Sequence, residues 1–347
     1  MLKTESPPSR LMRVAVVILN WNGKRFLEQF LPSVLEHSAE ANVYVADNAS
    51  TDGSLGFLKS NFPSVKLIDN GENLGFAGGY NKALRNLKED YFVLLNSDVE
   101  VSKDWLKPVI ELMDSDSSIA ACQPKIISQE QKSHFEYAGA AGGFIDKYGY
   151  PFCRGRIFDT LEKDANQYNN AIEVFWATGA CLFVRNNCFN SIGGLDEDFF
   201  AHMEEIDLCW RLKRAGYKVM VQPESVVYHV GGGTLPKSNP WKTFLNFRNG
   251  LEMLAKNLPK TQLFPVIFFR LILDGVAGIK FLLSGNFGDF FAIFKAHFAF
   301  YGRLNATLKK RSGNYDSVTK QFNGSMVYQY FVKGKKLFTD LPSDRFS

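Results

Sequence analysis

Several polar clusters in this chain carry side chains that could bind ions or move protons. The first is the turn 47–52, with sequence DNASTD, which directly follows an apolar run. Its small polar side chains and its two carboxylates, Asp47 and Asp52, could accept hydrogen bonds from a nucleobase or a ribose. The alternative is a helix cap, because Ser, Thr and Asp often satisfy the free N–H groups that open a helix. Both interpretations of this turn stay open.

A glycine-rich stretch, 73–81, opens a predicted helix. Helix N-termini favour anions through their free N–H groups and their dipole. The stretch matches neither the dinucleotide fingerprint nor the Walker sequence. Its glycines could instead allow close packing of the helix on a sheet.

The segment 96–98, Asn-Ser-Asp, ends another apolar strand and presents the carboxylate of Asp98. One carboxylate together with diphosphate oxygens is a normal way to hold Mg²⁺ or Mn²⁺, since these ions keep waters and share substrate phosphates. The alternative is that Asp98 forms a turn or caps a helix over 99–106.

Three carboxylates, Glu204, Glu205 and Asp207, begin a predicted helix. Acidic residues in a first turn are favoured by the helix dipole, and Asp207 with Arg211 forms an ordinary i,i+4 pair. However, three carboxylates beside an apolar aromatic stretch exceed what capping requires. A carboxylate in a partly apolar cleft can act as a general base.

His229 ends a short predicted strand and precedes a triple-glycine loop at 231–233. A lone histidine on a strand is more often structural than functional. Imidazole is nevertheless a suitable ligand for Mn²⁺. The glycine loop could close over bound phosphates and open for release.

Alternating strands and helices must position these clusters. The sequence predicts strands over 13–19, 42–46, 65–69 and 91–95, and helices over 24–37, 53–61 and 77–87. Such alternation predicts a doubly wound α/β sheet, in which ligands bind beyond the carboxyl ends of the strands. The turns 20–23, 47–52 and 96–98 should therefore share one pocket.

The rest of the chain is less regular. Glycines between 122 and 171 indicate hairpins and loops. We then expect a strand over 174–185 broken at 178–179, a helix over 206–215, strands over 218–222 and 226–229, and long helices over 241–308.

Composition limits the class of protein. The 347 residues, 46% of them hydrophobic, fit one large globular domain or two ordinary ones and exclude disordered and disulfide-scaffold classes. A formal charge of +4 does not support nucleic-acid binding. Five scattered cysteines fit a reducing cytosolic compartment. The polar arm 1–12 lacks the apolar core of a signal peptide.

The C-terminal apolar segment 263–283 approaches the length of a membrane span, and a second segment rich in aromatic residues follows over 290–304. Arg270, Asp274 and Lys280 make crossing costly, so amphipathic helices are expected. Their aromatic and basic residues are typical of helices that lie on an anionic membrane surface. The alternative is a helical subdomain packed on the preceding α/β domain or on a second subunit, so a homodimer stays open.

In chain order, these motifs resemble the family 2 glycosyltransferases of GT-A fold, including their bacterial rhamnosyltransferase-like branch. The resemblance covers about residues 13–250 and is carried by 16–23, 47–54, 73–81, 94–98, 179–181, 199–211 and 229–234. It implies an α/β, Rossmann-like, mostly parallel sheet flanked by helices, with a C-terminal helical extension. We therefore expect an arm over 1–12, a catalytic domain over 13–250 and a helical, membrane-associating region over 251–347.

The resemblance also implies roles for matching residues. Nucleotide-sugar binding falls to Asn20, Asn22, Asp47, Ser50, Asp52, Asn73, Gly75, Asn81, Asn96, Gly232 and Gly233. Asp98 and His229 would bind a divalent cation, Mg²⁺ or Mn²⁺. The catalytic base is Glu205, with Asp207 or Glu204 as alternatives, because the family usually has aspartate at this position. The metal motif departs from the family pattern as well, since Asn96 replaces its first acid.

The implied reaction is an inverting single displacement from a UDP- or dTDP-sugar to a hydroxyl of a glycan or lipid-linked acceptor. It would take place in the cytoplasm, at the inner face of the cytoplasmic membrane. The pair Arg248-Asn249 resembles one common in the rhamnosyltransferase-like branch and favours a dTDP-linked donor. Two alternatives are a catalytically silent nucleotide- or glycan-binding scaffold and a sugar nucleotidyltransferase. The second would need an N-terminal glycine-rich signature, which residues 19–24 do not contain. The missing dinucleotide fingerprint disfavours an oxidoreductase.

Overall fold

The computed structural model describes residues 13–231, 239–315 and 318–347. Its strands are β1 (Val14–Asn20), β2 (Asn42–Asp47), β3 (Lys66–Asp69), β4 (Tyr91–Asn96), β5 (Val99–Val101), β6 (Ile119–Ser128), β7 (Gly143–Asp146), β8 (Pro151–Cys153), β9 (Arg156–Ile157), β10 (Thr160–Leu161), β11 (Ile172–Val174), β12 (Cys181–Arg185), β13 (Lys218–His229) and β14 (Gln321–Phe322). The predicted arm 1–12 lies outside the described residues.

The α-helices are α1 (Lys24–His37), α2 (Ser54–Asn61), α3 (Gly75–Leu84), α4 (Lys107–Ser115), α5 (Asn186–Ser191), α6 (Glu204–Arg214), α7 (Pro240–Asn257), α8 (Lys260–Leu283) and α9 (Phe287–Lys309). Short helical turns are η1 (Glu197–Phe199), η2 (Tyr328–Val332), η3 (Phe338–Asp340) and η4 (Ser343–Arg345).

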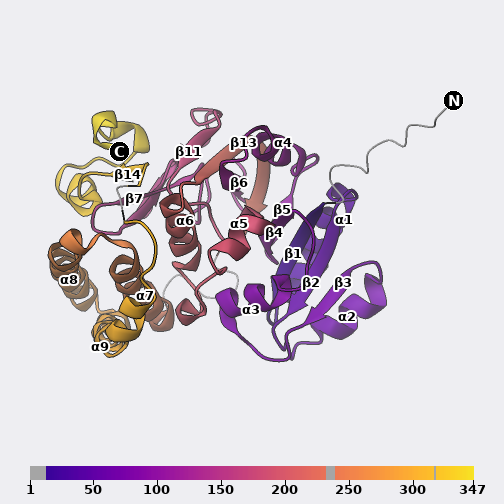
Figure 1. The fold of residues 1–347 in the computed structure, drawn as a ribbon, viewed down its shortest axis with the longest axis horizontal. Helices are drawn as coiled ribbons and strands as arrows, with labels where there is room; N and C mark the ends of the chain where they lie inside the picture. The colour runs from indigo at the N-terminus through magenta and orange to yellow at the C-terminus, as the bar shows by residue number, and fades with distance from the viewer. Residues whose placement is uncertain (1–12, 232–238, 316–317) are drawn as a thin grey trace.

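The larger sheet has the strand order β11-β13-β6-β12-β4-β1-β2-β3, and β5 pairs with β13. Strands β3, β2, β1 and β4 are parallel, as are β6 and β13. Strand β12 runs antiparallel between β4 and β6. The prediction of an α/β sheet flanked by helices is confirmed (Figure 1). The sheet is mixed rather than mostly parallel, however, because β13 also pairs antiparallel with β5 and β11, so that four of its neighbouring pairs are parallel and four are antiparallel.

Strand β1 shows why the sheet is covered on both faces. Its residues from Val14 to Ile18 are at most 2% exposed. Val14, Val16 and Ile18 pack in one apolar cluster with side chains of α1, α2 and α4. The alternate residues Ala15 and Val17 pack in a second cluster with side chains of α3 and α6. A continuous apolar run is the expected pattern for such a strand.

Three predictions of secondary structure differ from the structure. The strand expected over 174–185 is two strands, β11 and β12, separated by residues 175–180 and paired with different neighbours. Residues 99–101, within the segment considered as a helix over 99–106, form strand β5 because they pair with β13. The two strands expected over 218–222 and 226–229 form one strand, β13, with an irregular register between Gln222 and Val226. Pro223 lies there, and proline cannot donate a ladder hydrogen bond.

A smaller sheet, β10-β9-β8-β7-β14, forms from the hairpin region and the C-terminal segment. Strand β14 pairs in parallel with β7, so the end of the chain returns to residues far earlier in sequence. Phe144, Phe152, Phe322, Phe338 and Phe346 pack their rings together there.

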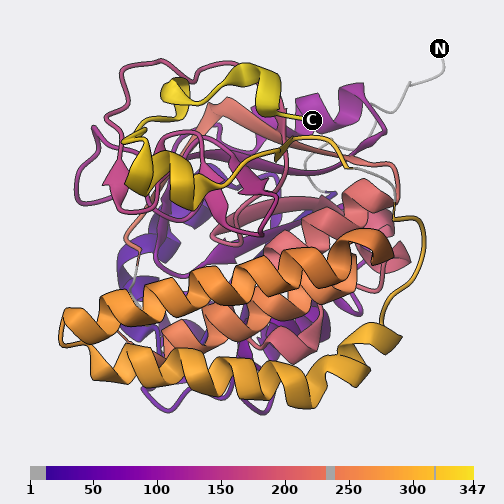
Figure 2. The ribbon, with the colours of Figure 1, turned by 90° about the vertical axis from the view of Figure 1, so that its left-hand side faces the viewer.

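Helices α7, α8 and α9 lie side by side on one flank of the molecule (Figure 2). Helix α7 packs against α6 and α9, and it runs through residue 250, where we divide the chain. The division into domains stays a prediction. None of the described helices combines the length and apolar character needed to cross a bilayer.

Candidate active site

Three polar turns meet at the carboxyl edge of the larger sheet. Parallel pairing sets Asn20 opposite Asp47 and Leu19 opposite Asn96, so the ends of β1, β2 and β4 are adjacent. A Cβ atom built on Gly23 would lie 2.6 Å from Asn20 Oδ1 and 3.2 Å from Ser97 Oγ. The turns after β1 and β4 are therefore in contact, as the sequence predicts.

Asp47 is fully buried and orders this edge. Its Oδ1 accepts a hydrogen bond from Asn20 Nδ2 at 2.8 Å, and its Oδ2 accepts one from the Ser50 amide at 2.8 Å. Ser50 Oγ in turn accepts from Asn20 Nδ2 at 3.0 Å and from the Asn22 amide at 2.9 Å. These four predicted nucleotide-binding residues thus form one hydrogen-bonded unit.

Asp52 behaves as the capping alternative expects. It accepts from the backbone amide of Lys24 at 2.8 Å and from that of Ser54 at 3.0 Å, at the starts of α1 and α2. Partial burial would raise the pKa of Asp52, but hydrogen bonds from Ser54 and Lys24 outweigh it and lower that pKa. Asp52, at the end of the turn 47–52, therefore joins the starts of α1 and α2.

The N-terminus of α3 is occupied by protein rather than open to an anion. The amides of Phe76 and Ala77 both point at the carbonyl of Phe200, at 2.7 and 3.3 Å. Gly75 has φ +68°, and a Cβ atom there would lie 2.5 Å from Phe200 O. Its own amide donates to Asn73 Oδ1 at 3.0 Å. The close-packing interpretation of this glycine-rich stretch is the one that the structure supports.

Two further predicted cleft residues make backbone contacts. Asn81 Nδ2 donates to Leu195 O at 2.8 Å and to Glu197 Oε1 at 3.0 Å, which joins α3 to the segment before α6. Asn96 is half-buried, and its amide donates to Ala180 O at 3.0 Å. Gly232 and Gly233 lie outside the described residues.

Asp98 and His229 lie side by side, as a shared cation would require. Strand β13 pairs His229 with Val99, so the adjacent Asp98 carboxylate faces the imidazole ring. His229 Nε2 lies 3.2 Å from Asp98 Oδ1, and both residues are buried. Burial would lower the pKa of His229, but the carboxylates of Asp98 and Glu136 outweigh it and raise this pKa to about 10.

Glu136 is a further candidate for this site that the sequence did not reveal. Its Oε2 lies 3.1 Å from His229 Nδ1, on the opposite side of the ring from Asp98. A carboxylate in this position fixes the orientation of an imidazole that binds metal through its other nitrogen. Glu136 stands in an irregular, glycine-rich part of the chain, and no motif or periodicity marks it.

The donor set suits a cation that shares its ligands with substrate. Asp98 offers a carboxylate, and His229 would offer an imidazole nitrogen once a cation displaces its proton; both groups suit Mn²⁺. Within the part of the chain that the structure describes, no group of three or more His, Cys, Asp or Glu residues could hold a metal ion. The remaining ligands would be diphosphate oxygens and water, which are the usual partners of Mg²⁺ and Mn²⁺ in nucleotide sites.

The three acids that begin α6 differ sharply in their surroundings. Asp207 is fully buried and accepts hydrogen bonds from Arg211 Nε at 2.7 Å, Lys256 Nζ at 2.9 Å and Asn257 Nδ2 at 2.7 Å. Burial would raise its pKa, but the charges of Arg211 and Lys256 outweigh it and lower this pKa. Asp207 thus anchors α6 to α7.

Glu205 and Glu204 lack such partners. The Oε2 atom of each is buried and has no hydrogen-bond partner among the described residues. Burial raises the pKa of Glu205 to about 7. Burial, together with the charge of Glu205, raises the pKa of Glu204 well above its ordinary value. An unsatisfied buried carboxyl group with a raised pKa is typical of a general base or acid.

A chain of contacts links these glutamates to the carboxyl edge of the sheet. Asn48, next to Asp47, donates from Nδ2 to Gly75 O at 2.8 Å. Gly75 packs on Phe200, whose segment leads directly into α6 at Glu204. Glu204 and Glu205 therefore lie on the same side of the molecule as the turn 47–52.

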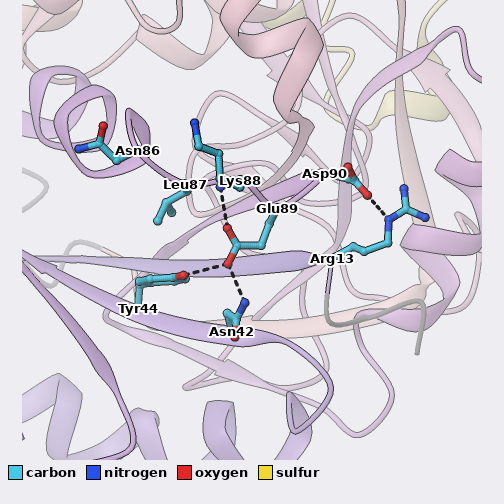
Figure 3. Close-up of a pocket in the computed structure, with 8 residues that line it drawn as sticks. All are labelled: Arg13, Asn42, Tyr44, Asn86, Leu87, Lys88, Glu89 and Asp90. Carbon is cyan, nitrogen blue, oxygen red and sulfur yellow. Dashed lines mark hydrogen bonds and ion pairs between the residues drawn. The ribbon is translucent and has the colours of Figure 1, made fainter. Parts of the chain in front are cut away.

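A hollow elsewhere is not part of this site. It has a volume of about 420 Å³ and is lined by Arg13, Asn42, Tyr44, Asn86, Leu87, Lys88, Glu89 and Asp90 (Figure 3). These residues precede or begin β1, β2 and β4, so the hollow lies at the amino edge of the sheet. Glu89 accepts from Asn42 Nδ2 at 2.7 Å and from Tyr44 Oη at 2.8 Å. Its polar groups thus pair with one another.

Known proteins resemble this chain in sequence and in fold. Residues 15–179 match the model of the family described as glycosyl transferase family 2. The chain is 28% identical over 231 residues to the N-acetylglucosaminyl-diphospho-decaprenol L-rhamnosyltransferase of Mycobacterium tuberculosis. The aligned region covers 62% of this chain and 75% of that protein. It is 23% identical over 223 residues to the rhamnosyltransferase WbbL of Escherichia coli, covering 62% and 83% respectively.

The fold comparison agrees with the sequence comparison. The crystal structure of GalNAc-T7 with UDP, GalNAc and Mn²⁺ superposes with a TM-score of 0.55 at 16% identity, over 71% of this chain and 48% of that one. At this identity the match concerns the fold, which is that of the GT-A glycosyltransferases.

Proposed function

This chain is a glycosyltransferase that belongs to family 2 and to its rhamnosyltransferase-like branch, and from that premise we propose its reaction. It transfers a sugar from a UDP- or dTDP-sugar donor to a hydroxyl of a glycan or lipid-linked acceptor, with inversion at the anomeric carbon. The observation that carries the proposal is the carboxyl group of Glu205, whose buried Oε2 atom has no hydrogen-bond partner in the described structure.

The donor and the acceptor that we propose follow the relatives. The mycobacterial protein is named as an L-rhamnosyltransferase acting on N-acetylglucosaminyl-diphospho-decaprenol. We therefore place a deoxyhexose, linked to dTDP, first among the donors to be tested, and a polyprenyl diphosphate-linked sugar first among the acceptors. The buried, hydrogen-bonded unit around Asp47 would order the turn that faces the nucleotide.

In the proposed reaction, Glu205 removes the proton of the acceptor hydroxyl. The hydroxyl oxygen then forms a bond to the anomeric carbon while the bond from that carbon to the diphosphate breaks. Asp98 and His229 would hold a divalent cation, which supplies positive charge to the departing diphosphate. Glu136 Oε2, 3.1 Å from His229 Nδ1, would help to orient the ring with Nε2 toward Asp98. Only one substitution occurs at the sugar, so its configuration inverts.

The test compares Glu205→Gln with Glu204→Gln, its matched neighbour. With dTDP- and UDP-sugars and Mn²⁺, Glu205→Gln should abolish transfer while nucleotide binding, measured by calorimetry, stays as in the wild type. Glu204→Gln should keep most of its turnover. Near-normal turnover of Glu205→Gln would remove this base from the mechanism. Loss in Glu204→Gln alone would assign the base to Glu204.

We also propose that α8 and α9 rest on an anionic membrane surface. Their exposed apolar side chains recur every three or four residues, and the most exposed are Phe264 at 79%, Phe298 at 74% and Leu283 at 83%. The others are Phe268, Phe269, Ile272, Val276, Ile279 and Leu282 on α8 and Phe287, Phe291, Phe294 and Tyr301 on α9. Aromatic stripes of this kind suit the boundary between headgroups and acyl chains.

The charges around these stripes have one sign. Residues 261–302 are all described, and their exposed charged side chains are Lys280 and Lys295. The acids of the same segment, Asp274 and Asp289, are buried. Arg270, also buried, pairs with Asp274 at 2.7 Å. Exposed cations without exposed anions favour an anionic lipid surface over a neutral one.

Vesicle sedimentation tests this placement. The full chain should bind phosphatidylglycerol vesicles and bind phosphatidylcholine vesicles less. Lys280→Gln with Lys295→Gln should weaken binding about fivefold for each lysine, at about 1 kcal/mol per charge near the surface. Lys103→Gln with Lys107→Gln, before and at the start of α4 respectively, is the matched control. Failure to bind either vesicle would refute the placement, and a dimer dispersed by Phe298→Ser would assign this face to a second copy.

A cytoplasmic location fits the thiols. Five cysteines, all within the described residues, are free and buried. An oxidising compartment favours disulfides, so free thiols favour the proposed location at the inner, reducing face of the cytoplasmic membrane.

A further inference from the structure

We infer that Asn249, oriented by Arg248, is a positioning residue for the catalytic carboxylate. It holds the backbone of residues 199–202, the segment that leads into Glu205. This inference rests on the proposed role of Glu205 and extends it to helix α7, which carries neither the nucleotide-binding turns nor the acids of α6.

The Asn249 carboxamide contacts three carbonyl groups of this segment. Its Nδ2 lies 2.9 Å from Phe199 O, 2.9 Å from Ala201 O and 2.8 Å from His202 O. An amide NH₂ group has two hydrogens, so at least one of them is shared between carbonyls. Asn249 is fully buried, and water does not compete for these bonds.

Arg248 decides which way the amide points. Its Nε donates to Asn249 Oδ1 at 2.8 Å, which leaves the NH₂ group facing the carbonyls. Its guanidinium also lies 3.2 Å from the carbonyls of Asp198 and Phe199. Glu252, at 3.8 Å, balances the charge of this buried arginine. The pair therefore acts as one unit on the segment before α6.

The segment needs this support because its backbone is strained. Phe200, His202 and Met203 have φ angles of +64°, +69° and +73°, and none of them is glycine. Such conformations persist only where surrounding contacts enforce them, and they cluster at functional sites. Asn249 binds three of the carbonyls, and the Phe200 carbonyl accepts from α3. Every carbonyl from residue 199 to 202 is thus held.

The consequence is a fixed direction for Glu205, which follows Met203 by two residues at the start of α6. If the carbonyl contacts are lost, the strained residues can relax and the first turn of α6 can shift. A displacement of about 1 Å at a reacting group costs on the order of 100-fold in rate. Asn249 does not touch the nucleotide-binding turns, so nucleotide affinity should not change.

The experiment measures steady-state transfer by full-length Asn249→Ala. We expect kcat to fall about 100-fold, with the KM for donor and the calorimetric affinity for nucleotide unchanged. The matched control is Asn246→Ala on the same helix, whose Nδ2 donates to Lys242 O within α7. This control should keep wild-type kcat. If Asn249→Ala fails to fold, Arg248→Lys, which keeps the charge, should lower kcat by a smaller factor.

The outcomes separate this inference from the proposed function. Wild-type protein without transfer, or an active Glu205→Gln, would refute the proposed function. An active wild type and an inactive Glu205→Gln, together with normal kcat in folded Asn249→Ala, would overturn the inference alone. Equal losses in Asn249→Ala and Asn246→Ala would also overturn it, because they would reflect the stability of α7.

Discussion

Replacing Asp207 by asparagine tests whether this acid is an anchor or a base. The carboxylate is fully buried and receives three donors from Arg211, Lys256 and Asn257. Asparagine removes the negative charge and turns an NH₂ group toward at least one of these donors. Breaking a buried ion pair by removing one partner costs about 3–5 kcal/mol.

We expect the lower end of that range, because one cation keeps a second partner. Lys256 also binds Asp196, with Nζ 2.6 Å from Oδ2. A loss of about 3 kcal/mol corresponds to a fall of roughly 6–12 °C in the thermal midpoint, at 2–4 °C per kcal/mol for domains somewhat smaller than this chain. Turnover at low temperature should stay within about twofold of the wild type, because the lowered pKa and three partners leave Asp207 unsuited to accept a proton.

Circular dichroism melts and initial rates at 15 °C give both quantities. Glu111→Gln, on an exposed position of α4, is the control and should melt within a degree or two of the wild type. The pKa of Asp207 is lowered in the folded state, so its stabilisation is present above the ordinary aspartate pKa of about 3.9 and is lost as pH falls further. The thermal midpoints of the wild type and of Asp207→Asn should therefore begin to converge as pH falls below about 4. A normal midpoint with lost turnover would show that Asp207 is the base.

Three further predictions concern neighbouring residues. Because the pKa of Glu205 is raised to about 7, kcat should fall as pH drops below neutrality, and a flat profile down to pH 5 would contradict its role as base. Glu136→Gln should weaken Mn²⁺ binding about 10–100-fold in calorimetry with nucleotide present, whereas unchanged affinity would separate Glu136 from the metal site. Gly75→Ala should lower the thermal midpoint, since its Cβ would lie 2.5 Å from Phe200 O, while Gly56→Ala, with open space around its Cβ, should not.

The sheet and its polar edge could be predicted because both depend on local patterns. Continuous apolar runs mark the strands that are buried on both faces, and parallel pairing then brings their carboxyl ends together. This logic placed the turns after Asn20, Asp47 and Asn96 at one edge, where the structure has them. It could not decide between ligand contacts and capping for Asp52, which caps two helices.

Long-range pairing explains what the sequence left undecided. Asp98 and His229 meet because β5 pairs with β13, yet residues 99–101 carry too short a pattern to indicate a strand. Glu136 enters the site from an irregular segment without periodicity, so only the folded chain shows it beside His229. The family resemblance, rather than the spacing, predicted that Asp98 and His229 belong together.

The choice among the three acids of α6 shows why residue type alone does not assign a base. Glu204, Glu205 and Asp207 are equivalent in charge and close in sequence, so the sequence left all three open. The structure separates them through helix α7, whose Lys256 and Asn257 bind Asp207, whereas Oε2 of each glutamate has no hydrogen-bond partner among the described residues. The same helix holds the strained segment before α6 through Asn249. Helix α7 thus pairs with the charge of Asp207 and supports the segment that orients Glu205. The catalytic assignment therefore depends on a helix that lies beyond the residues matched by the family model.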